Sequence, residues 1–128
     1  MLEDIERGGH IYTYVDLLWW NIFKIQESVV RGDIQKACER VDLLIRVLPN
    51  EMVDECKEMF EYMIKQVRVK CNERCGKYID KINAKTCMEK CRKSEIKDGL
   101  KTVLEYISTE LERLGYKSYL RKVPKEYV

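Results

Sequence analysis

Apolar positions along this chain recur at helical spacing. Residues 10–31 are apolar nearly all round between Tyr14 and Phe23, which predicts a helix at the centre of a bundle or across a subunit interface. Residues 34–48 carry the apolar stripe of an amphipathic second helix. Gly32 and Asp33, which lie between the two segments, are residue types that end one helix and cap the next.

The apolar stripe continues into a third helix, predicted from about residue 51 to Cys75. Pro49 is expected to end the second helix and Asn50 to cap the third. After the third helix we expect an extra helical turn at residues 78–82 and a loop at residues 83–85.

Thr86 and Glu89 have the spacing of a capping box, so a fourth helix is expected to begin just before Cys87. Gly115 is suited to end that helix. Asp98 and Gly99 mark a point where the helix is expected to kink or restart.

The sequence thus predicts an all-α protein, an antiparallel bundle of four main helices whose last two form a hairpin. Its 128 residues suit one domain, which we place at residues 1–115, followed by a basic tail at 116–128. Charged residues make up 36% of the chain, above the usual quarter, and only two prolines and six glycines interrupt it, as is typical of helical proteins.

Four cysteines form a twin pattern: Cys71-x3-Cys75, then eleven residues, then Cys87-x3-Cys91. Cysteines four apart share one face of a helix, so two antiparallel helices would pair Cys71 with Cys91 and Cys75 with Cys87. Two disulfides are the favoured interpretation. The alternatives are one zinc ion held by four thiolates, with zinc then the only cofactor expected, or four free core thiols.

The twin Cys-x3-Cys spacing resembles that of the small Tim chaperones of the mitochondrial intermembrane space, in which two disulfides staple a helical hairpin. The resemblance covers residues 71–91 and implies the stapled geometry, not the function, because about seventy residues precede the motif. Residues 20–49 also resemble one tetratricopeptide-type helix pair. No second copy is apparent, which favours a generic hairpin.

Charge is unevenly distributed along the chain. Residues 1–64 hold seven Lys/Arg and thirteen Asp/Glu, a net charge of −6, whereas residues 65–101 hold twelve and five, a net charge of +7. Much of the basic run is expected to share one exposed surface of the hairpin. That surface is either a solvated face or a contact for nucleic acid. The candidate nucleic-acid-binding residues are Lys70, Arg74, Lys77, Lys81, Lys85, Lys90, Arg92, Lys93 and Lys97.

Trp19 and Trp20 point about 100° apart on one helix, so both cannot be buried against the same neighbour. We expect one of them to face a partner protein or a second subunit. Cys38 and Cys56 lie on apolar stripes and are expected to be buried thiols, with a third bridge as the alternative.

Catalytic motifs are not apparent, and His10 is the only histidine, so we do not expect an enzyme. The most apolar stretch, residues 11–30, contains Asp16, Asn21, Lys24, Gln26 and Glu27, so no membrane partner is expected. The acidic N-terminus does not have the layout of a secretory signal, which predicts a cytoplasmic protein. Disulfides persist inside hyperthermophiles, so we expect a thermophile or its virus or plasmid as source, with the host cytoplasm as the location of a viral protein.

The sequence therefore predicts a non-enzymatic helical interaction module stabilised by a stapled hairpin. Its expected partner is another protein or a second copy, which would make it a homodimer. One alternative is a DNA- or RNA-binding protein that uses residues 65–101 and the tail, and the other is a structural zinc protein with a four-cysteine site.

Overall fold

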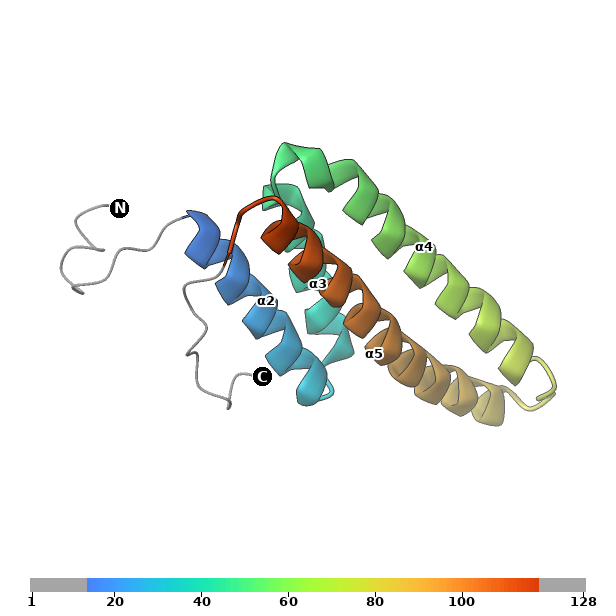
Figure 1. The fold of residues 1–128 in the computed structure, drawn as a ribbon. Helices are drawn as coiled ribbons and strands as arrows, with labels where there is room; N and C mark the ends of the chain where they lie inside the picture. Colours follow the sequence, from blue (N-terminus) through green and yellow to red (C-terminus); the bar gives the residue numbers. More distant parts are fainter. Residues whose placement is uncertain (1–13, 118–128) are drawn as a thin grey trace.

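The computed structural model describes residues 14–117, which form four α-helices and no strand (Figure 1). The helices are α2 (Tyr14–Val30), α3 (Ile34–Val47), α4 (Asn50–Cys75) and α5 (Lys81–Arg113). Helix α2 packs mainly against α3, and α4 mainly against α5. The predicted all-α antiparallel bundle, with its last two helices joined as a hairpin, is confirmed.

The junction of α2 and α3 follows the sequence prediction. Gly32 has a positive φ of 81°, a conformation that costs glycine little, and the amide of Asp33 donates to the carbonyl of Ser28 at 2.9 Å. The carboxylate of Asp33 then accepts from the amide of Lys36 at 3.1 Å, which caps α3.

The C-terminal end of α5 is closed in the same way and is tied to α2. Gly115 has a φ of 94°, and the amide of Tyr116 donates to the carbonyl of Leu111 at 2.8 Å. The carbonyl of Tyr116 accepts from Nε1 of Trp19 at 2.7 Å, and the Tyr116 ring lies 6.2 Å edge-on from that of Tyr14. Trp19 is therefore buried within the chain. Beyond Lys117, the predicted tail lies outside the described residues, as do residues 10–13 of the predicted first helix.

Helix α5 begins earlier than predicted. Its N-cap is Asp80, whose carboxylate accepts from the amide of Ile82 at 3.1 Å. Thr86 lies inside the helix, where its hydroxyl donates to the carbonyl of Ile82 at 3.0 Å, one turn back. Three predictions are therefore wrong: the loop at residues 83–85, the helix start near Cys87 and the helical turn reaching back to residue 78. An earlier aspartate supplies the cap, and the residues before it form the turn.

The N-cap of α4 also differs from the prediction. Asn50 is the first residue of the helix and does not cap it. Pro49 occupies the N-cap position, and no side chain bonds to the free amides there. The carbonyl of Pro49 accepts from the amide of Met52 at 2.9 Å.

Helix α5 continues without a break through Asp98 and Gly99, so it does not restart there. A Cβ atom at Gly99 would lie 2.5 Å from Cγ of Met63 on α4. The missing side chain at Gly99 therefore leaves room for the side chain of Met63, and the glycine does not end either helix.

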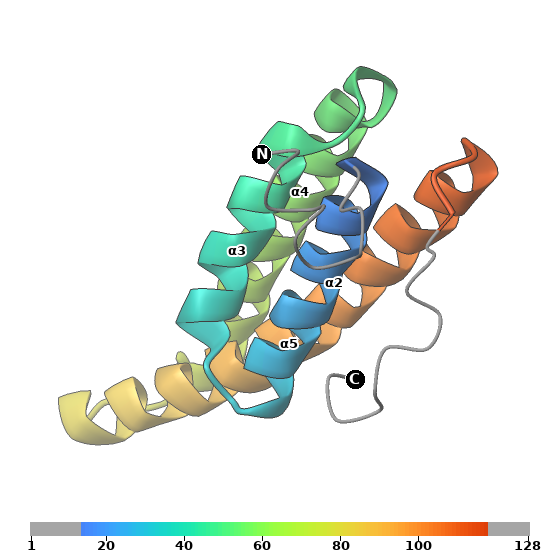
Figure 2. The same cartoon turned by 90° about the vertical axis from the view of Figure 1, so that its left-hand side faces the viewer.

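The hydrophobic core lies where α2 and α3 cover α4 and α5. Beyond Val67 on α4 and before Ile96 on α5, the second hairpin buries little besides its cysteines, and its far part extends past the first hairpin (Figures 1 and 2). We call residues 68–95 the arm and the remaining described residues the body. The largest fully buried side chains of the body come from all four helices: Leu18, Ile22, Ile25, Val41, Leu44, Cys56, Leu100, Val103, Ile107 and Leu111.

Replacing Gly99 tests the close approach of α4 and α5. Leucine favours a helix over glycine by about 1 kcal/mol, so helix propensity alone would make Gly99→Leu more stable. A net loss of stability must therefore come from packing. We expect the free energy of unfolding, measured in urea, to fall by about 1–3 kcal/mol. The loss should shrink in a Met63→Ala background. An unchanged or increased stability of Gly99→Leu in the wild-type background would contradict the packing described for Met63.

The cystine-stapled arm as candidate functional site

The arm has almost no core apart from its cysteines. Among residues 68–95, the side chains that are buried are Cys71, Cys75 and Cys91. Cys87 and Met88 are half-buried, and most of the remaining side chains are exposed. Two helices alone can cover only one narrow stripe, and in the arm that stripe carries sulfur instead of branched aliphatic side chains.

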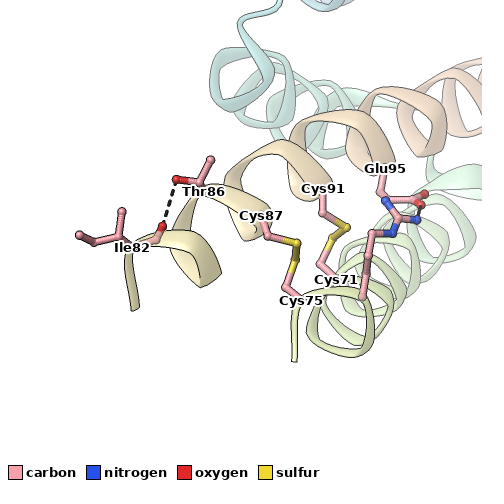
Figure 3. The surroundings of a disulfide bond; sticks show 8 residues. Cys71, Cys75, Ile82, Thr86, Cys87, Cys91 and Glu95 are labelled. Atoms are coloured by element: carbon pink, nitrogen blue, oxygen red, sulfur yellow. Dashed lines mark hydrogen bonds and ion pairs between the residues drawn. A yellow bond between two sulfur atoms is a disulfide. The ribbon is translucent and has the colours of Figure 1, made fainter. Parts of the chain in front are cut away.

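Two disulfides join the helices of the arm as successive rungs (Figure 3). Cys71 bonds to Cys91 with their Cα atoms 5.6 Å apart, and Cys75 bonds to Cys87 with Cα atoms 5.7 Å apart. Both separations are usual for disulfides. The predicted pairing is confirmed. The rungs span 20 and 12 positions of sequence. Each is worth roughly 3 kcal/mol in the chain-entropy description.

All nine predicted nucleic-acid-binding residues are exposed on the arm or just beyond it. Arg74 on α4 forms an ion pair with Glu95 on α5, with Nη2 and Oε1 2.8 Å apart, so it adds a polar link between the helices next to the rungs. Nζ of Lys77 lies 5.4 Å from the centre of the Tyr78 ring, a cation–π distance.

Several of the basic residues border grooves along the arm. Arg74 and Lys90 border a groove of about 340 Å³ beside Cys87, together with Tyr78. Lys70, one turn before Arg74 on α4, borders a groove that also contains Asp98 and Glu95, the ion-pair partner of Arg74. At the base of the arm, two further basic residues face the start of α3 and its acidic side chains; the residues there are Asp33, Glu39, Arg92 and Lys93.

The two tryptophans have different environments, as their spacing predicted. Trp19 is buried against the C-terminal end of α5, whereas Trp20 is exposed, with Nζ of Lys24 5.0 Å from the centre of its ring. Of the two predicted interface residues, Trp20 is therefore the one on the surface.

Cys38 and Cys56 are both free thiols, so the alternative of a third bridge is not realised. Cys56 is fully buried, and burial raises its pKa to about 11. Cys38 is half-buried, and burial likewise raises its pKa. Both groups are thus neutral thiols near pH 7 and behave as small apolar side chains.

Residues 76–82 form the tip of the arm, which the sequence does not predict as a candidate site. The sequence predicts an extra helical turn at residues 78–82, and that prediction does not reveal the exposure of Ile79 and Ile82. Gly76 and Asp80 bracket a turn ahead of α5, and these two residue types are the sequence signal for an exposed tip here.

Comparisons with protein-family models, with curated proteins and with solved structures each found no match to this chain. Among residues 14–117 there is no group of three or more His, Cys, Asp or Glu side chains that could hold a metal ion. Over the same residues, none of the helices has the length and apolar character needed to cross a bilayer.

The mass of the intact protein before and after reduction separates the disulfide pairs from the zinc alternative. We expect a gain of roughly two hydrogen masses per bridge on reduction, and no zinc in the metal analysis. One zinc per chain with an unchanged mass would instead establish a thiolate site. An unchanged mass without zinc would mean four free thiols, and either outcome contradicts the rungs.

Proposed function

We propose that this chain is a non-enzymatic interaction module whose contact element is the arm, and that its partner is a protein. One observation carries this proposal: the arm adds almost nothing to the core of the body, yet two covalent rungs hold it in place. Ordering a segment costs about 1–2 kcal/mol per residue in backbone entropy. A segment that is held ordered without adding to the core is best explained by a contact outside the chain.

The positive charge on and around the arm favours a partner whose contact surface is anionic. Residues 65–101 carry a net charge of +7, and every Lys and Arg among them is exposed. A rigid arm also loses little conformational freedom on binding, because the rungs order it before the partner arrives. We place the protein in the cytoplasm of a thermophile, or in that of a thermophilic host if it is encoded by a virus or plasmid, because disulfides persist inside such cells.

Charge reversal on the arm tests the proposal against a matched change on the body. Lys85→Glu with Lys90→Glu alters the arm, and Lys36→Glu with Lys57→Glu is the control, since all four residues are exposed. Each form would be immobilised and exposed to an extract of the source cells and to free copies of the chain. We expect wild type and control to retain the same partner, and the arm variant to retain at least about tenfold less, a loss of about 1.4 kcal/mol. Equal retention by all three forms would contradict the proposal.

A nucleic-acid-binding function is the second candidate, and the exposure of all the basic side chains between Lys65 and Lys101 favours it. Contacts with six or more phosphates should make the affinity for a 30-base-pair duplex fall by about 10³ between 50 and 200 mM salt. Fluorescence anisotropy measures this loss directly. Failure to bind the duplex even at about 20 mM salt would eliminate this candidate.

A further inference from the structure

The tip of the arm presents apolar side chains between lysines. Ile79 is 99% exposed and Ile82 is 75% exposed, which are the largest values among the large hydrophobic side chains of the described residues. Lys77 and Lys81 flank them in sequence and are exposed as well. Two aliphatic side chains held in water at the end of a covalently braced hairpin form a small projecting apolar knob with positive charge around it.

The opposite end of the body has an exposed apolar patch of its own. The hydroxyl of Tyr14 on α2 donates to the carbonyl of Val47 on α3, so these residues lie side by side. Leu17 lies about one turn after Tyr14, and Leu43 lies about one turn before Val47, so in antiparallel helices they continue the same surface. We call these four exposed residues the end patch.

Carboxylates lie beside the end patch. Burial first, and then the charges of Tyr116 and Glu51, raise the pKa of Tyr14, which places Glu51 near its hydroxyl. Asp54 lies one turn further along α4 and is exposed. Residues 50–64 of α4 hold five acidic residues and one basic residue, whereas residues 65–75 hold four basic residues and one acidic residue. About 36 Å of helix separates Glu51 from Cys75, so opposite charges gather at opposite ends of α4 (Figure 1).

We infer that copies of this chain associate head to tail, with the tip of one arm seated on the end patch of the next copy. The inference rests on the proposed function and names a second copy as the partner. The tip and the end patch both expose apolar side chains, and the charges beside them are opposite in sign. Seating a tip on an end patch therefore pairs lysines with carboxylates. Tip against tip, or end against end, would bring like charges together. Such a contact is heterologous and generates an open chain of copies unless the rotation closes a ring.

Two variants that each disable one half of the contact test this arrangement. Ile79→Glu places a charge at the tip, and Leu43→Glu places one in the end patch, at a side chain that is 59% exposed. Light scattering on the intact chain, at low salt and rising concentration, should give wild type a mass of several chains. Each variant alone should stay at the mass of one chain, 15.3 kDa. A one-to-one mixture should form a two-chain species, because one intact tip meets one intact end patch.

Controls separate this contact from general adhesion. Val30→Glu changes an exposed apolar residue outside both surfaces and should leave the wild-type masses unchanged. Glu51→Lys should weaken the association about tenfold at low salt, and by less at about 500 mM salt, where charges are screened.

Several outcomes would overturn the inference. The inference fails if wild type stays at the mass of one chain at every concentration, or if the mixed variants do not form a two-chain species. If wild type stayed monomeric while the Lys85→Glu/Lys90→Glu variant still lost an outside partner, head-to-tail association would fail and the proposed interaction function would stand. If wild type, the arm variant and the control all retained the same proteins equally, the proposed function would fail instead.

Discussion

Two covalent rungs between α4 and α5 determine the shape of this molecule. Helices α2 and α3 have 17 and 14 residues, whereas α4 has 26 and α5 has 33. By helical rise the first hairpin is about 21–26 Å long and cannot cover helices of about 39 and 50 Å. The uncovered part has no apolar layer, and two bare helices in water are marginal. Disulfides at Cys71–Cys91 and Cys75–Cys87 supply there what packing supplies in the body.

The body and the arm are therefore stabilised by different physical means and present different surfaces. The body is held by aliphatic packing. In addition, Trp19 on α2 donates a hydrogen bond to the carbonyl of Tyr116, just after the end of α5. The arm is held by sulfur and by the Arg74–Glu95 ion pair, which leaves nearly all its other side chains free to contact solvent or a partner. Charge follows the same division, because α4 is acidic within the body and basic in the arm.

Local rules predicted much of this structure, and contacts between distant residues account for the rest. Gly32, Asp33 and Gly115 act through their own backbone or nearest neighbours, and the cysteine spacing fixes a helix face, so these features were predicted from sequence. The start of α5 was not, because Asp80 and Thr86 are both good caps. The role of Gly99 depends on Met63, 36 positions earlier, and the exposure of Ile79 depends on where the body stops. No local sequence pattern gives the contact between Gly99 and Met63 or the point at which the body ends.

Amide hydrogen exchange with and without reductant tests most directly whether sulfur, and not packing, holds the arm. If the rungs replace a core, reduction at neutral pH should speed exchange of arm amides, between about residues 70 and 92, by at least roughly 100-fold, the factor that corresponds to losing the roughly 3 kcal/mol of a single rung. Amides of α5 inside the body, near Leu100 to Leu111, should keep their protection, since aliphatic packing there is independent of the rungs. Arm amides that stayed equally protected after full reduction would contradict the account.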